Sequence, residues 1–188
     1  MLLQNILLTI CLLLILISGI IINLSKKSNS NIKSFDKKSL LLFRILIPFS
    51  LTLSLSIYFL KLNFSFSTNI LILIGSLLVF LGLTIRWIAV LTLKESFTVS
   101  IEIQVDQKLK TNGIYTYIRH PSYTGLLVYY LGLGLLMTNY LSLTILIIGP
   151  LIAVLYRINK EELMLKNHFS SAFVKYSQKS KKIIPFIY

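Results

Sequence analysis

The sequence contains few charged residues, and acidic residues are especially scarce. Only 13% of its 188 residues are charged, with 6 Asp and Glu against 19 Lys and Arg, whereas soluble domains usually carry about 25% charged residues. Hydrophobic residues make up 55% of the chain, and the mean hydropathy is +0.81. One small core cannot remove this much apolar surface from water, so the composition argues against a soluble domain and favours a membrane protein of one domain.

Several common functional sites lack the residues that they need. Cys11 is the single cysteine and lies in an apolar run, so we expect a packing role for it and no disulfide within the chain. His120 and His168 have no nearby cysteines, and no zinc or other metal site is predicted. The chain has no complete glycine-rich dinucleotide loop and no Gly-x-Ser-x-Gly nucleophile elbow.

Long apolar runs are the main positive feature. A helix needs roughly 20 apolar residues to cross a bilayer, and the run over residues 2–24 has neither the positive start nor the cleavage site of a signal peptide. Thr138 and Asn139 interrupt the last run and divide it into two helices of a tight hairpin. The sequence therefore predicts an all-α integral membrane protein with about five transmembrane helices, over residues 2–24, 40–60, 69–93 and, as the hairpin, 121–156.

The basic residues predict how these helices are oriented. The segments at residues 25–38, 94–120 and 157–188 hold 16 of the 19 Lys and Arg. Two predicted spans separate each of these segments from the next, so all three lie on the same side of the membrane. Lys and Arg concentrate on the cytoplasmic side and match its anionic lipids. We therefore expect an N-terminus outside and a cytoplasmic C-terminus, with membrane lipid rather than nucleic acid explaining the net charge of +13.

Two arginines lie inside predicted spans. Arg44 is close to the first basic segment and can extend its charge to the surface. Arg86 lies about 10 Å deep if its helix ends near Leu93. Charged residues within spans are candidates for function by default, but the sequence leaves open whether Arg86 contacts a ligand.

Polar residues cluster immediately before the predicted hairpin. Gly113 indicates a turn, and Pro121 suits the first position of a helix. Arg119 and His120 would then lie at the positive end of the helix dipole, which favours an anion. The alternative is that these residues and nearby tyrosines only anchor a helix end at the membrane interface.

A second polar cluster follows the hairpin. Arg157 and Glu161 are four residues apart and share one face of a helix, and Glu161 and Glu162 are two of only 6 acids in the chain. An ordinary surface pair is the alternative reading. Because a hairpin returns the chain to its starting side, however, we expect Arg157 and Glu161 to come close to Arg119 and His120.

Together the two clusters resemble a known family. Residues 113–125 have the pattern Gly-x-Tyr-x-x-x-Arg-His-Pro-Ser-Tyr-x-Gly, and residues 157–162 have Arg-x-x-x-Glu-Glu. This ordered combination is similar to the isoprenylcysteine carboxyl methyltransferase family, and phospholipid N-methyltransferases are similar in the same region. The resemblance covers roughly residues 96–185. It divides the chain into a three-helix membrane region, residues 1–93, and a methyltransferase region, residues 94–188. The second region is expected to contain a cofactor loop, the membrane hairpin and a cytoplasmic C-terminal helix.

The resemblance implies a site for S-adenosylmethionine on the cytoplasmic side. It assigns cofactor contacts to Gln107, Leu109, Lys110, Tyr115, His120, Pro121, Ser122, Tyr123 and Glu161. Arg157 matches a substrate-contacting arginine, and Arg157 and His120 are the candidate catalytic residues. Gln107 stands where histidine is common and Lys110 where valine is common, so the sequence departs from the family pattern before Gly113.

The implied reaction is methylation of a carboxylate on a lipophilic, isoprenylcysteine-like substrate. Such a carboxylate is ionised at neutral pH and needs no base, whereas an amine would need a proton acceptor such as His120 or Glu162. Phospholipid amine or thiol methylation stays open as an alternative. A noncatalytic membrane carrier or assembly protein is the alternative from another class, although a carrier would be expected to show paired repeats or broken spans. No protein partner beyond a lipidated substrate is predicted.

Overall fold

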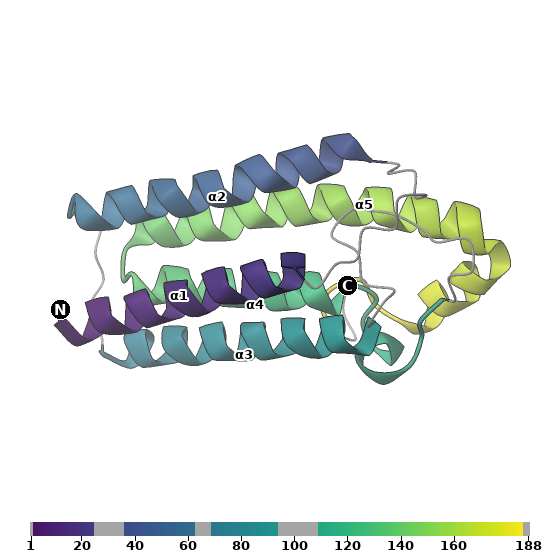
Figure 1. Cartoon of the computed structure of the whole chain (residues 1–188), viewed down its shortest axis with the longest axis horizontal. Helices are drawn as coiled ribbons and strands as arrows, with labels where there is room; N and C mark the ends of the chain where they lie inside the picture. Colours follow the sequence, from purple (N-terminus) through teal and green to yellow (C-terminus); the bar gives the residue numbers. More distant parts are fainter. Residues whose placement is uncertain (1, 25–35, 63–68, 94–108, 186–188) are drawn as a thin grey trace.

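The computed structural model describes residues 2–24, 36–62, 69–93 and 109–185, and these ranges are all-helical. They form α1 (Leu2–Leu24), α2 (Lys37–Phe59), α3 (Asn69–Leu93), the short 3-10 helix η2 (Gly113–Thr116), α4 (Pro121–Leu136) and α5 (Tyr140–Lys179). Figure 1 shows α1 to α5 running side by side in one elongated bundle. The all-α prediction is confirmed, and the bounds of α1 and α3 agree with the predicted ones.

The helices of this bundle have the length and the apolar surface of transmembrane helices. Within the described ranges, α1, α2, α3 and α5 are long and apolar enough to cross a membrane. α4 has 16 residues and is about 24 Å long at the helical rise, so it is the short member of the predicted five. Large apolar side chains face outward along the bundle, among them Leu13, Leu16 and Ile20, each more than half exposed. Such an apolar surface requires lipid as its solvent, and the chain is a multi-pass membrane protein.

The helices pack in two close pairs. α3 lies along α4, and α2 lies along α5, while α1 contacts α3 and α4. Helices α1, α3 and α5 run toward one end of the bundle, and α2 and α4 start there (Figure 1). This end is therefore where the start of α2, the end of α3 and the start of α4 meet α5.

Glycines bring α3 and α4 into backbone contact. A Cβ atom on Gly82 would lie 2.5 Å from the Gly125 carbonyl oxygen, and one on Gly75 would lie 2.7 Å from the Gly132 oxygen. The two contacts are about two helical turns apart on each helix. In lipid, where apolar side chains gain little by leaving the solvent, close packing over small residues is a main source of helix association.

The turn between α4 and α5 forms the predicted hairpin. α4 ends at Leu136, and Asn139 caps α5 by accepting a hydrogen bond from the Ser142 amide at 3.0 Å. Gln4 of α1 donates to the Leu136 carbonyl at 2.9 Å and to the Thr138 hydroxyl at 3.0 Å. The predicted interruption at Thr138 and Asn139 is confirmed, and α1 supports it.

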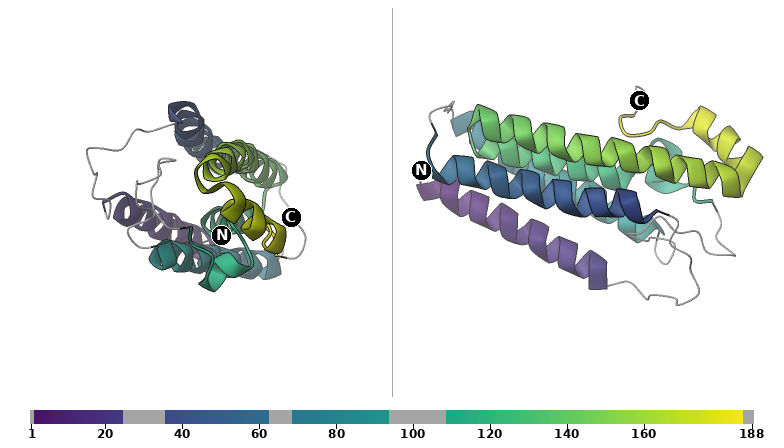
Figure 2. Two further views of the ribbon diagram at one scale, coloured as in Figure 1. Left: turned by 90° about the vertical axis from the view of Figure 1, so that its right-hand side faces the viewer. Right: turned by 90° about the horizontal axis from the view of Figure 1, so that it is seen from above.

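α5 is far longer than the predicted second arm of the hairpin. The 30 residues from Tyr140 to the kink at Ser170 correspond to about 45 Å, about one and a half times the thickness of the hydrocarbon core. Ser170, with φ 45° and ψ −117°, interrupts the helical geometry, and the last part of α5 (yellow) turns back there (Figure 2). The chain after α5 then pairs with the segment before α4, because Arg119 N–H donates to the Lys181 carbonyl at 2.7 Å and His120 N–H to the Lys182 carbonyl at 3.1 Å.

The glycine contacts predict a position-specific loss of stability. We expect Gly82→Ala to lower the apparent Tm in detergent by roughly 3–10 °C, because the new methyl group would meet backbone atoms of α4 and push the helices apart. Gly19→Ala is the matched control, since a Cβ atom there meets nothing within 4 Å. Thermal unfolding of both variants measures the effect, and equal Tm values for the two would show that the α3–α4 contact is not this close.

Candidate functional site

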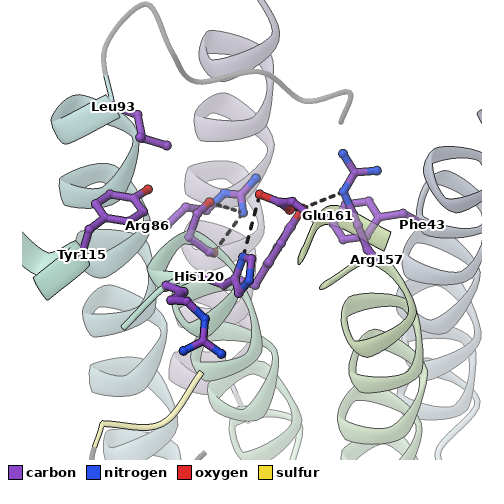
Figure 3. Close-up of a pocket in the computed structure, with 10 residues that line it drawn as sticks. Phe43, Arg86, Leu93, Tyr115, His120, Arg157 and Glu161 are labelled. Carbon is purple, nitrogen blue, oxygen red and sulfur yellow. Dashed lines mark hydrogen bonds and ion pairs between the residues drawn. The ribbon is translucent and has the colours of Figure 1, made fainter. Parts of the chain in front are cut away.

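A polar pocket lies at the end of the bundle where α2, α3, α4 and α5 come together. It contains about 530 Å³ of empty space, including space open to solvent. Figure 3 shows Arg86 and Tyr115 on one side of His120 and Glu161, with Phe43 and Arg157 on the other. The lining residues are Phe43, Arg86, Leu93, Tyr115, Arg119, His120, Ser122, Tyr123, Arg157 and Glu161.

The Tyr123 hydroxyl connects the two arms of the hairpin. It accepts a hydrogen bond from Nε of Arg157 at 2.7 Å and donates one to Oε2 of Glu161 at 2.9 Å. Because Arg157 and Glu161 are one turn apart on α5, a single phenol in the first turn of α4 reaches both. The predicted proximity of the two clusters is confirmed.

Arg157 is held from α2 as well as from α4. Its side chain is 3% exposed, and its guanidinium carbon lies 5.4 Å from the centre of the Phe43 ring. This position over an aromatic face stabilises the cation. The Phe43 ring also lies 6.2 Å from the Tyr123 ring, so one apolar side chain supports both members of the hydrogen bond.

His120 lies between the two adjacent carboxylates of α5. Its Nε2 is 3.3 Å from Oε1 of Glu162, and its Nδ1 is 3.8 Å from Oε1 of Glu161. The ring is nearly stacked on Tyr123, with an interplanar angle of 27°. His120 is the N-cap residue directly before Pro121, so its imidazole lies at the mouth of α4.

Glu162 and Arg119 form an ion pair that helps to hold the end of α5 and the residues after it against the start of α4. Nε of Arg119 lies 2.7 Å from Oε1 of Glu162, and Lys182 Nζ lies 3.7 Å from Oε2. Arg119 also donates to the carbonyls of Ser177 and Ser180. The two neighbouring glutamates therefore have different surroundings: Glu161 lines the pocket, and Glu162 binds cations beside it.

Tyr115 lies on η2, which starts at the predicted turn. Gly113 has φ +63°, a conformation that glycine adopts without strain. The Tyr115 hydroxyl donates to the Ala89 carbonyl of α3 at 3.3 Å, and the Tyr176 hydroxyl donates to the Tyr115 carbonyl at 2.6 Å. Burial raises the pKa of Tyr115 above its ordinary value, with the nearby Glu161 and Tyr176 adding to the effect, so its phenol stays neutral and can act as a donor.

Arg86, whose contact the sequence left open, lines the pocket. Its Nη1 donates to the backbone oxygen and to the hydroxyl of Ser122, both at 3.2 Å. The close approach of α3 and α4 at Gly82 and Gly125, one turn away along each helix, makes this reach possible.

The pocket contains most but not all of the predicted site residues. Tyr115, His120, Ser122, Tyr123, Arg157 and Glu161 line it, whereas the described residues Leu109, Lys110 and Pro121 do not. Gln107 lies outside the described residues. Phe43 and Leu93 were not predicted, since nothing distinguishes them in sequence from the many other apolar residues of their spans.

This fold and pocket define a class: a multi-pass membrane protein with an arginine-rich polar pocket at one end of its helix bundle. Residues 70–167 match the isoprenylcysteine carboxyl methyltransferase (ICMT) family, and the chain belongs to this family. The resemblance drawn from the Arg-His-Pro-x-Tyr and Glu-Glu motifs is thereby confirmed.

Named relatives agree with this assignment. The chain is 37% identical over 127 residues to protein-S-isoprenylcysteine O-methyltransferase of Saccharomyces cerevisiae, a match that covers 66% of this chain and 53% of the yeast protein. It is 34% identical over 116 residues to a probable protein-S-isoprenylcysteine O-methyltransferase of Oryza sativa subsp. indica, covering 61% of each. The match therefore spans just over half of these relatives' length.

A solved structure shares the fold. The eukaryotic intramembrane Ras methyltransferase ICMT superposes with a TM-score of 0.67 and 29% sequence identity, over 74% of this chain and 52% of that one. The part of the helix bundle that this match covers therefore has the arrangement found in an intramembrane methyltransferase.

Proposed function

We propose that the protein is a membrane methyltransferase that uses S-adenosylmethionine and methylates a carboxylate of a lipophilic, isoprenylcysteine-like substrate. One observation carries the proposal: the hydrogen-bonded trio of Tyr123, Arg157 and Glu161 lies inside the pocket of a chain that belongs to the ICMT family. The names of its relatives support the same reaction.

The residues of the pocket suit this cofactor. Glu161 keeps 29% of its side chain exposed, and its carboxylate can accept hydrogen bonds from an ammonium or from ribose hydroxyls. Tyr115 and Tyr123 offer flat apolar faces, and His120 and Ser122 complete the proposed set. Contacts of Gln107, Leu109, Lys110 and Pro121 with the cofactor are proposed from the family resemblance alone. When bound, the cofactor supplies an electrophilic methyl group.

Arg157 is proposed to orient the acceptor carboxylate. A guanidinium binds a carboxylate through two parallel hydrogen bonds, which sets its direction as well as its distance. The Phe43 ring and the Tyr123 hydroxyl hold Arg157 in place, so little reorganisation is needed when the acceptor binds. An ionised carboxylate is already nucleophilic, and the protein's contribution is then alignment and exclusion of water.

The charge of the pocket favours a carboxylate over an amine acceptor. Its lining contains three arginines, Arg86, Arg119 and Arg157, against the single carboxylate of Glu161. A positive pocket attracts an anion and raises the cost of bringing in a protonated amine. With an amine acceptor, His120 would be the group in the pocket able to take its proton.

The pocket end of the bundle is proposed to face the cytoplasm. The start of α1 lies at the opposite end of the bundle from the starts of α2 and α4 (Figure 1). Lys37 begins α2 and Arg119 lies just before α4, and basic residues mark the cytoplasmic side. The membrane would be the cell membrane in a prokaryote and the endoplasmic reticulum in a eukaryote.

Methyl transfer from tritiated S-adenosylmethionine tests the proposed activity. Purified protein with an S-prenylcysteine acceptor is expected to give a base-labile methyl ester. Glu161→Gln and Arg157→Gln are each expected to lower the rate by about 10- to 100-fold, because each removes a charge-assisted contact worth about 1.5–3 kcal/mol. Lys160→Gln, an exposed α5 position outside the pocket, is the matched control and should retain activity. Label recovered only in lipid amines or volatile thioethers would contradict the carboxylate assignment.

Topology reporters test the proposed orientation. A reporter active only outside the cytoplasm should be silent when fused after Tyr188 and active when fused before Met1, because an odd number of crossings separates the two ends. The reverse pattern would show that the topology is inverted, and equal activity at both ends would rule out an odd number of membrane crossings.

A further inference from the structure

The returning segment, residues 171–184, carries a basic surface at the pocket end of the bundle (Figure 2). It contains no Asp or Glu and four lysines, Lys175, Lys179, Lys181 and Lys182. The first three of these side chains are exposed, and no ion pair includes any of the three among the residues that the structure describes. Their positive charges are therefore presented to the solvent.

Two residues that line the pocket hold this segment in place. The Tyr176 hydroxyl donates to the Tyr115 carbonyl at 2.6 Å, and Nη1 of Arg119 donates to the Ser177 carbonyl at 3.1 Å. Tyr115 and Arg119 both belong to the pocket lining. Because the exposed lysines are close in sequence to these anchored residues, short contacts keep them beside the pocket.

The backbone of Lys181 is paired with the chain just before α4. Its N–H donates to the Tyr117 carbonyl at 3.0 Å, and its carbonyl accepts from the Arg119 N–H at 2.7 Å. The pairing lies within three residues of His120, while the Lys181 side chain stays exposed. The segment therefore presents its charges from an ordered backbone.

The acids of α5 do not neutralise this surface. Glu161 lines the pocket and accepts from Tyr123, and Glu162 is paired with Arg119 and lies 3.7 Å from Lys182 Nζ. The preference of Lys and Arg for one side of a membrane explains why lysines gather at this end. It does not explain why the segment that folds back onto the pocket holds them against the pocket wall.

A lipidated protein acceptor would bring its own polypeptide to this surface. In the proposed reaction the methylated carboxylate belongs to the cysteine that carries the lipid, so the peptide chain starts at the same residue. Six residues of that chain span at most about 20 Å, which keeps them near the pocket mouth. Charges at the rim of a binding site speed the association of partners of opposite sign and slow that of partners of the same sign.

We infer that the returning segment selects acceptors with acidic residues just before the lipidated cysteine, through Lys175, Lys179 and Lys181. The inference rests on the proposed function and adds to it the charge of the acceptor's polypeptide. A peptide with several Asp or Glu in this stretch is attracted to the rim, and a polybasic peptide is disfavoured. The three lysines act on the approach of the acceptor and do not contact the reacting atoms.

Methylation of three acceptors in a nonionic detergent tests the inference. Two are S-farnesyl peptides with either three Asp or three Lys among the six residues before the cysteine, and the third, N-acetyl-S-farnesylcysteine, has no peptide and serves as the reference within each protein. In the wild type, kcat/KM should be about 10-fold higher for the acidic than for the basic peptide at low salt. The ratio should fall toward one as the ionic strength rises to about 0.5 M, because salt screens exposed charges.

The variant Lys175→Gln/Lys179→Gln/Lys181→Gln should lose most of this ratio at low salt. The matched control is Lys37→Gln/Lys38→Gln/Lys160→Gln, which removes the same number of exposed lysines from α2 and α5 outside the pocket and should keep the wild-type ratio.

Several outcomes would overturn the inference. One is a wild-type ratio near one, and another is a ratio that persists in the returning-segment variant. An equal loss in the control would show an effect of net charge alone. A variant with an unchanged ratio whose activity falls only in vesicles of anionic lipid would show that the segment binds the membrane instead. Wild-type protein that methylates none of the three acceptors would overturn the proposed function itself, whereas methylation of N-acetyl-S-farnesylcysteine without discrimination between the peptides overturns the inference alone.

Discussion

The pocket depends on one phenol shared between two helices. The Tyr123 hydroxyl accepts a hydrogen bond from Nε–H of Arg157 and donates one to Glu161, so a cation and an anion of α5 are both fixed by the first turn of α4. In an apolar bundle an unsatisfied polar side chain is expensive, and this shared contact lets two ionisable groups sit at the edge of the hydrocarbon region. Their directions then determine what the pocket can bind.

Helix packing places that phenol. Glycines allow α3 and α4 to touch through their backbones, which brings Arg86 to Ser122, next to Tyr123. The α4–α5 turn, capped by Asn139 and held by Gln4, returns the chain so that Arg157 reaches the level of Tyr123. On the other side, the last part of α5 folds back at Ser170, and its following residues pair with Arg119 and His120. Contacts at both ends of the bundle thus fix the geometry of the pocket.

The sequence predicted those features that depend on local chemistry. The lengths of the apolar runs predicted the spans, Thr138 and Asn139 predicted the hairpin, and Pro121 predicted the start of α4. Each of these signals acts over a few residues: hydropathy for the spans, helix capping for the hairpin turn, and the missing proline N–H for the start of α4. The sequence also predicted that a helix leaves the last span and carries Arg157 and Glu161, as α5 does. It did not predict the reversal at Ser170, since serine has no intrinsic preference for that conformation. Nor could it identify Phe43 and Leu93, because the choice of packing partners among apolar helices in lipid depends on shape and leaves no pattern in hydropathy.

We propose that the Tyr123 hydroxyl organises the cofactor site. The Kd of Tyr123→Phe protein for S-adenosylhomocysteine measures this contribution. Phenylalanine keeps the ring beside Phe43 and His120 and removes only the two hydrogen bonds, so the Kd should rise by about 10-fold or more. Because the buried Arg157 loses a partner, the Tm should also fall by a few degrees, and binding is measured well below the Tm of both proteins. Tyr117→Phe, at a position 59% exposed and outside the pocket, should bind like the wild type. Wild-type affinity in the Tyr123→Phe protein would contradict this role of the Tyr123 hydroxyl.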